Sequence, residues 1–102
     1  MLDDTFHALA HPVRREIVSQ LAGNRQTVLE LASHFDISLN GVSKHIKVLE
    51  KAGLVQRDVQ GRTHYCMLNP APLQQADDWM GYYRSFWNQR LDALGDYLNK
   101  RK

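Results

Sequence analysis

The stretch SLNGVSKHIKVLEKA, residues 38–52, decides the fold of this chain of 102 residues. It begins with Ser38, a residue that caps helix N-termini, and it is followed by Gly53, which suits the left-handed position after a helix. We therefore predict a single helix here. Its apolar residues recur at helical spacing and predict one buried stripe, made of Val42, Ile46 and Leu49.

The opposite face of this helix is polar and carries Asn40, Ser43, Lys44 and Lys47, with no carboxylate before Glu50. Amide, hydroxyl and ammonium groups are the ones that bind base edges and phosphates in DNA, so this face fits a recognition helix. An ordinary amphipathic surface helix is the alternative, because polar outer faces are common. The neighbouring segments decide between the two.

Composition bounds the class of protein. A length of 102 residues and a hydrophobic content of 43% are typical of one globular domain. No apolar run approaches the roughly 18 residues of a membrane span, and the acidic start MLDDTFHALA does not resemble a signal peptide, so we expect a cytoplasmic protein with no membrane partner. The single cysteine, Cys66, excludes an internal disulfide and the paired thiols of a zinc ribbon.

The net charge of +2 is too small to indicate a nucleic-acid partner by itself. Its distribution is more informative, because residues 38–64 contain only Glu50 and Asp58 as acids. The bases of the same segment are Lys44, Lys47, Lys51, Arg57 and Arg62. The sequence therefore predicts a local positive surface, with a solvated surface of mixed charge as the alternative.

Two helices precede this segment. Residues 4–10 predict a short helix, and Pro12 suits the first turn of a second helix that runs to about Ala22. The buried stripe of the second helix is predicted to be Val13, Ile17, Val18 and Leu21. Arg14 and Arg15 lie near its start, where the helix dipole disfavours positive charge. Either a DNA phosphate or an acid such as Glu16 explains them.

A third helix is predicted over residues 28–35, with Thr27 as its cap and Glu30 completing a capping box. Residues 36–38 then form a three-residue turn before the helix described first. A short helix, a turn and a longer helix with a polar outer face form a helix-turn-helix, in which the first helix supports the second.

After Gly53 the apolar pattern changes to period two. Residues 54–60 and 62–68 predict two strands joined around Gln60 and Gly61, which is a β-hairpin, and a hairpin in this place is a wing. Three basic side chains are expected on or near its tip, where they can reach phosphates or a minor groove: Arg57, Arg62 and His64. Solvent-facing residues without a partner are the alternative.

The last helix is predicted over residues 73–99, with a length of roughly 40 Å. It holds five aromatic residues between positions 79 and 87, more apolar surface than one side of a small domain covers, so we predict a homodimer through this helix with help from the first. The predicted interface is Phe6, Leu73, Met80, Tyr83, Trp87, Leu91, Leu94 and Leu98. The alternative is that the aromatic side chains line a pocket for a small-molecule effector.

The chain resembles the ArsR/SmtB family of dimeric winged-helix repressors, on four runs: LAHPVRREIV at 9–18, VLELASHF, ISLNGVSKHIKVLEKAGLV at 37–55 and the wing RDVQGRTHYCML. The resemblance implies DNA contact by Ser38, Asn40, Ser43, Lys44 and Lys47, backbone contact by Arg14 or Arg15, and wing contact by Arg57 and Arg62. His45 occupies the histidine of the S-x-H pattern, where it either binds a phosphate or holds the helix to its neighbour.

Two departures from the family pattern matter. Leu39 stands where many relatives carry a polar base-reading residue, so it either touches a thymine methyl or is buried. Metal-responsive members of the family use cysteines on the third helix, or carboxylates and histidines on the last. Here the third helix has no thiol and the last has no histidine, while His7 and His11 lack a third ligand, so no metal site and no cofactor are predicted.

No phosphate-binding loop, nucleophile elbow or metal-plus-base motif is present, so we do not expect an enzyme. The predicted fold is mainly α with a small β-hairpin: one winged helix-turn-helix domain, with a DNA-binding core at 10–68 and dimerisation helices at 1–9 and 73–99. The predicted function is a homodimeric repressor that binds double-stranded DNA at a pseudo-palindromic operator. A repressor with a small-molecule effector and a winged-helix module that docks proteins are the alternatives.

Overall fold

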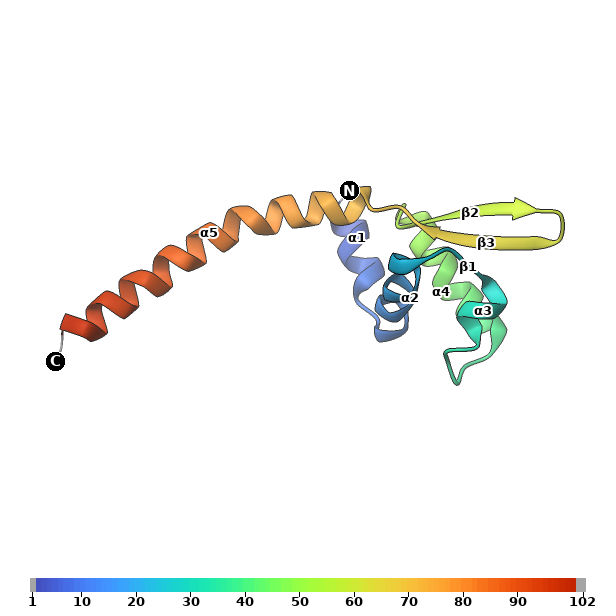
Figure 1. Cartoon of the computed structure of the whole chain (residues 1–102), viewed down its shortest axis with the longest axis horizontal. Helices are drawn as coiled ribbons and strands as arrows, with labels where there is room; N and C mark the ends of the chain where they lie inside the picture. The colour runs from blue at the N-terminus through green and yellow to red at the C-terminus, as the bar shows by residue number, and fades with distance from the viewer. Residues whose placement is uncertain (1, 101–102) are drawn as a thin grey trace.

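The computed structural model describes residues 2–100. Its elements follow in the order α1 (Leu2–Leu9), α2 (Pro12–Gly23), β1 (Gln26–Thr27), α3 (Val28–Ala32), α4 (Leu39–Lys51), β2 (Val55–Gln60), β3 (Thr63–Leu68) and α5 (Ala71–Lys100). The first four helices and the hairpin pack together, and most of α5 runs away from them as a long arm (Figure 1). The predicted fold, a mainly helical winged helix-turn-helix with a long last helix, is confirmed.

Helix α4 forms as its capping residues predict. The Ser38 hydroxyl accepts a hydrogen bond of 3.0 Å from the Gly41 N–H, and Gly53 adopts a φ of +79° just after the helix. The apolar stripe is fully buried, with Val42, Ile46 and Leu49 each 0% exposed. Because this stripe faces the core, the polar side of α4 is left at the surface.

The core around α4 comes from α1, which contributes Ala8, and from three further segments. It includes Ile17 and Leu21 of α2, Leu31 of α3, and the residues Leu54, Val55 and Cys66 at the base of the wing. The expected stripe of α2 is confirmed at its centre, whereas Val13 and Val18 at its edges are only half-buried.

Helix α3 is shorter than predicted. Its capping box is present, since the Glu30 N–H donates to Thr27 Oγ1 at 3.1 Å and the Thr27 N–H donates to Glu30 Oε1 at 3.1 Å. The helix ends at Ala32. The Ser33 N–H still bonds four residues back to Leu29 O, but Phe35 N bonds only three residues back, to Ala32 O. The connection to α4 therefore covers residues 33–38. The predicted start of the helix at Val28 is confirmed, whereas its predicted end at residue 35 and the three-residue turn are wrong.

The hairpin is part of a sheet of three strands in the order β1-β3-β2, all antiparallel. Strand β1, a segment of two residues too short to give an alternating pattern, was not predicted. Gln60 pairs with Thr63, so Gly61 and Arg62 form a two-residue turn. Gly61 has a positive φ of +63°, whereas the φ of Arg62 is negative. This is the pattern of a type II′ turn, whose twist matches that of the strands.

Helix α5 is packed only at its beginning. Asn69 joins it to the core, since its side-chain amide donates to the carbonyl oxygen of Gly53 at 2.9 Å and its Oδ1 accepts from the Ala71 N–H. Ala76 is buried, and the Phe6 ring of α1 meets the Trp79 ring edge-on at 5.8 Å. Beyond Gly81 every described residue of α5 is exposed. Within residues 2–100, no helix has the length and apolar character needed to cross a membrane.

We expect Ile46→Ala to lower the free energy of unfolding by about 2–5 kcal/mol, because it leaves a cavity beneath α4. Urea unfolding followed by far-UV circular dichroism, at one fixed protein concentration, measures the change. The exposed neighbour provides the control, since Lys47→Ala should shift the same curve by no more than about 0.5 kcal/mol. A loss for Ile46→Ala no larger than for this control would contradict the packing described for α4.

Candidate nucleic-acid interface

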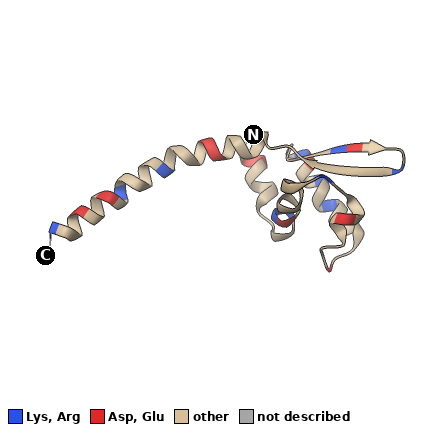
Figure 2. Ribbon diagram, in the orientation of Figure 1, with Lys and Arg blue, Asp and Glu red and all other residues tan. Residues whose placement is uncertain are grey.

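The outer face of α4 presents polar and basic groups to solvent. Asn40, Lys44 and Lys47 are exposed and Ser43 is half-buried. Neither lysine makes an ion pair with any residue from 2 to 100. Figure 2 shows basic residues on α4 and on the hairpin, on the part of the molecule opposite to the arm formed by α5. This face is therefore free to meet an anionic partner.

Leu39, the first residue of α4, is 47% exposed. Of the two alternatives raised by the sequence, burial is excluded. An apolar side chain at the exposed start of this helix is suited to contact with a thymine methyl group.

Arg14 and Arg15 hold the end of α1. Arg14 donates from Nε to the carbonyl oxygen of Ala8 and from Nη2 to that of His7 at 3.2 Å, and Arg15 donates from Nη1 to the carbonyl oxygen of Leu9 at 2.8 Å. The last carbonyls of a helix lack intrahelical partners and attract cations. Both arginines thus have partners that the sequence did not indicate, neither an acid nor a phosphate.

His45 joins α4 to α2. Its ring centroid lies 4.3 Å from that of His11, and its Nδ1 lies 3.4 Å from Arg14 Nη1. His11 in turn caps α2, because its Nδ1 accepts a hydrogen bond from the Val13 N–H at 3.1 Å. Burial lowers the pKa of His45, and the charges of His11 and Arg14 lower it further. These contacts favour the structural alternative for His45 over a phosphate contact.

Arg57 does not lie at the tip of the wing, and this part of the expectation is wrong. It lies in the middle of β2 opposite Cys66, and its side chain is only 25% exposed. Since cross-strand partners project from the same face of a sheet, Arg57 faces inward like the buried Cys66. Its Nη2 donates to Glu50 Oε1 at 2.6 Å, and its Nη1 lies 3.3 Å from His64 Nδ1. Arg57 therefore links α4 to the wing.

The outer face of the wing is held by Arg25, which the sequence did not identify. Its guanidinium lies 4.2 Å from the centroid of the Tyr65 ring and 3.6 Å from Asp58. Asp58 and Tyr65 are cross-strand partners and so project from the same face. Arg25 precedes β1, and without β1 the sequence places it in a loop with no known neighbour.

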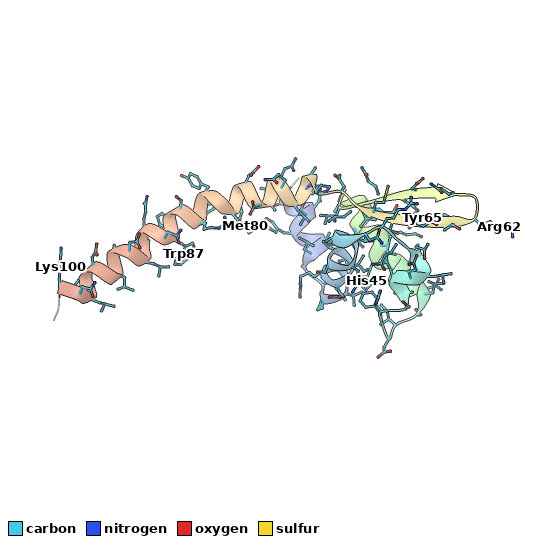
Figure 3. All side chains as sticks on the ribbon, viewed as in Figure 1. His45, Arg62, Tyr65, Met80, Trp87 and Lys100 are labelled. Carbon is cyan, nitrogen blue, oxygen red and sulfur yellow. The ribbon has the colours of Figure 1, made fainter. Side chains whose placement is uncertain are left out.

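The structure brings the wing and α4 together around a cleft. The cleft has a volume of about 470 Å³ and is lined by Thr27, Val28, Leu29, Ser43, Arg57, Arg62, Thr63 and His64. Arg62 lies at the tip of the hairpin (Figure 3), where the sequence expected it. Of the predicted DNA-binding residues, Ser43, Arg57, Arg62 and His64 thus share one site.

A second surface is apolar. Trp79, Met80, Tyr83, Arg84 and Trp87 line a cleft of about 500 Å³ on α5, and Met80 and Trp87 are labelled along the arm in Figure 3. Further along the helix Leu91, Leu94 and Leu98 are all more than half exposed. Leu73 differs from the other residues of the predicted interface, because it is half-buried against the core of its own chain.

The residues available for metal binding are few. Within residues 2–100, no group of three or more His, Cys, Asp or Glu side chains is arranged to hold a metal ion. Cys66 is buried, and burial raises the pKa of its thiol, with Glu50 adding to the rise and Arg57 opposing it.

Comparison with known proteins agrees with this arrangement. A family model described as a helix-turn-helix domain matches residues 9–57. The chain is 33% identical to the transcriptional repressor SdpR of Bacillus subtilis over 79 residues, which is 78% of this chain and 88% of that protein. It is 39% identical to the HTH-type transcriptional regulator Rv2034 of Mycobacterium tuberculosis over 97 residues, which is 95% of this chain and 88% of the other.

A solved structure is similar over a comparable length. The crystal structure of an ArsR family transcriptional regulator superposes with a TM-score of 0.79 at 34% identity, and the match covers 85% of this chain and 96% of that one. Its sequence similarity extends beyond the helix-turn-helix to most of the fold.

The lowered pKa of His45 gives a testable pH dependence. Below the ordinary value of 6.5, the unfolded chain takes up a proton at His45 that the folded chain does not, so the stability of the fold falls as pH falls through this range. NMR titration should give a pKa below 6.5 for His45. His45→Gln should remove part of the stability loss seen between about pH 6.5 and pH 5, and an identical loss in the variant would contradict the packing of His45 against His11.

Proposed function

Because the chain belongs to the ArsR/SmtB family of winged-helix, DNA-binding transcription regulators, we propose that it is a homodimeric repressor that binds a pseudo-palindromic operator. The relatives that match over most of the chain are transcriptional regulators, not enzymes. The observation that carries the proposal is the exposed basic face of α4. This face lies beside the wing, and the opposite, apolar side of the same helix is fully buried.

In this proposal α4 enters a major groove. The residues that contact bases or nearby phosphates are Ser38, Leu39, Asn40, Ser43, Lys44 and Lys47, and Arg62 contacts the backbone from the wing tip. Arg14, Arg15, His45 and Arg57 support this surface, because each makes at least one polar contact within the protein. Two copies related by a twofold axis would read half-sites about 10 base pairs apart, or a multiple of this.

The proposed dimer forms through α5. This helix of 30 residues would be about 45 Å long, and the exposed apolar row Met80, Tyr83, Trp87, Leu91, Leu94 and Leu98 continues almost to its end. Contiguous apolar surface of this kind marks an interface in a soluble protein. The α5 helix of a second copy, with its α1, is the proposed cover.

A second proposal concerns the same surface. The cleft lined by Trp79, Met80, Tyr83, Arg84 and Trp87 is large enough for a small organic molecule, so an apolar effector that alters DNA binding is the other candidate. Changes in the fluorescence of Trp79 and Trp87 during a metabolite screen, at a protein concentration where the dimer is complete, separate an effector from dimerisation.

The experiment that tests the function is selection of bound duplexes from a random DNA pool, run in parallel with a mixture of divalent metals and with a chelator. An enriched inverted repeat that is the same in both conditions supports a dimeric repressor without a metal sensor. Loss of the motif with one metal would reject the metal-free proposal. If no DNA sequence is enriched in any condition, DNA binding is rejected, and a winged-helix module that docks proteins is the remaining alternative.

The double variant Lys44→Ala and Lys47→Ala should weaken binding to the selected operator and should reduce the slope of log K against log salt concentration by about 2, one for each lost phosphate contact. Fluorescence anisotropy at several salt concentrations measures both. Lys51→Ala is the matched control, since Lys51 lies on the same helix beside Asp4 and His7, and it should leave the slope unchanged. An unaltered slope in the double variant would reject α4 as the recognition helix.

Replacing two exposed apolar residues of α5 by acids, Trp87→Glu with Leu94→Glu, should convert the dimer to a monomer and lower operator affinity at least tenfold, because each half-site alone binds weakly. Analytical ultracentrifugation measures the mass. Gln75→Glu adds an acid to an exposed position at the start of the same helix and should remain dimeric. A double variant that sediments as a dimer would place the interface elsewhere.

A further inference from the structure

The cleft between α4 and the wing has polar walls on both sides. Ser43 and Glu50 are seven residues apart, so they lie on the same side of α4, and the bond from Glu50 to Arg57 shows that this side faces the wing. On β3, His64 is two residues from the buried Cys66 and projects from the same, inward face of the hairpin. Ser43 and His64 therefore line the same cleft from opposite sides.

Arg57 fixes the hydrogen-bonding state of His64. A guanidinium can only donate hydrogen bonds, so in the contact of 3.3 Å between Arg57 Nη1 and His64 Nδ1 the imidazole nitrogen must accept. The ring hydrogen is then on Nε2. Within residues 2–100 this Nε2–H has no hydrogen-bond partner, and the exposed position of His64 leaves it available to a ligand.

The charges around the cleft favour an anion. None of its lining residues is Asp or Glu. The charge of Arg57 is already compensated by Glu50 at 2.6 Å, whereas Arg62 makes no ion pair with residues 2–100. The other polar lining groups are hydroxyls of Ser43, Thr27 and Thr63 and the Nε2–H of His64, and the apolar Val28 and Leu29 complete the lining. Hydroxyl, imidazole and guanidinium donors without a carboxylate are the groups that bind a phosphate.

The position of the cleft identifies the source of that phosphate. If α4 enters a major groove and the wing reaches the adjacent minor groove, the sugar-phosphate strand that separates the two grooves must pass between them. We propose that a backbone phosphodiester of the operator sits in this cleft, where it accepts hydrogen bonds from the Ser43 hydroxyl and from His64 Nε2. Arg57 is a positioning residue that holds His64 in this tautomer. This inference rests on the proposed function.

Variants of His64 test the contact. His64→Asn is too short to place a donor where Nε2 lies and should weaken operator binding about tenfold, as expected for a lost hydrogen bond to a charged group. His64→Gln can place an amide N–H near that position and should recover most of the affinity. Val59→Thr changes the cross-strand neighbour of His64, which does not line the cleft, and should bind as the natural protein does.

The salt dependence separates this contact from an ionic one. A neutral imidazole releases no counterion, so His64→Asn should lower the affinity without changing the slope of log K against log salt, whereas Arg62→Ala should reduce the slope by about 1. Operator affinity for His64→Asn within twofold of the natural protein, or a slope changed by about 1, would overturn the proposal.

Replacing single operator phosphates by neutral methylphosphonates locates the partner. One position in each half-site should weaken binding of the natural protein, and His64→Asn and Ser43→Ala should be insensitive at that same position while remaining sensitive at the others. Equal sensitivity of all three proteins at every position would overturn the shared phosphate site. Chemical-shift changes at His64 on adding submillimolar inorganic phosphate, without DNA, would assign the cleft to a free anion instead.

The outcomes distinguish this inference from the proposed function. A natural protein that selects no DNA rejects both. A second outcome rejects only the phosphate site. In that case the natural protein binds its operator and the Lys44 and Lys47 double variant reduces the salt slope, but His64→Asn leaves the affinity unchanged. The proposal of a repressor then stands.

Discussion

The rest of the structure depends on the burial of one stripe of α4. Val42, Ile46 and Leu49 are fully buried. Because Asn40, Lys44 and Lys47 lie on the opposite side of the helix, they must face solvent. Elements α2 and α3 and the base of the wing supply the apolar groups that cover this stripe. The binding surface is thus a consequence of core packing, because rotating the helix to hide its lysines would expose its apolar side chains.

Three arginines fix the elements around that helix, and each joins two different elements of the fold. Arg14 binds the last carbonyls of α1 and approaches His45 on α4, Arg57 joins Glu50 on α4 to the wing, and Arg25 holds Asp58 and Tyr65 on the outer face of the wing. Arginine suits this role because its planar group donates in several directions at once. The basic residues thus divide into those that support the surface and those, such as Lys44 and Arg62, that remain free among residues 2–100.

Helix α5 has two parts with different surroundings. Around Ala76 it packs against α1 and the core, and beyond Gly81 it carries aromatic and aliphatic side chains that are exposed, among them Trp87, Leu91 and Leu94. An extent of 68 Å along the longest axis, against 27 and 22 Å along the others, reflects this arm (Figure 1). Helices in proteins gain most of their stability from packing of an apolar face, which is the physical basis for proposing a second copy as the partner of this row.

The sequence by itself determined the helix-turn-helix, the hairpin with its turn at Gly61, the caps at Ser38 and Thr27, and the buried stripe of α4. These features are local: they depend on residues a few positions apart, which a single sequence displays. Only the tertiary structure decided the partners of Arg14, Arg25 and Arg57, the early end of α3 at Ala32 and the pairing of β1. A guanidinium can donate to a phosphate, a carboxylate or a helix carbonyl, and which one it meets depends on segments that only folding brings together.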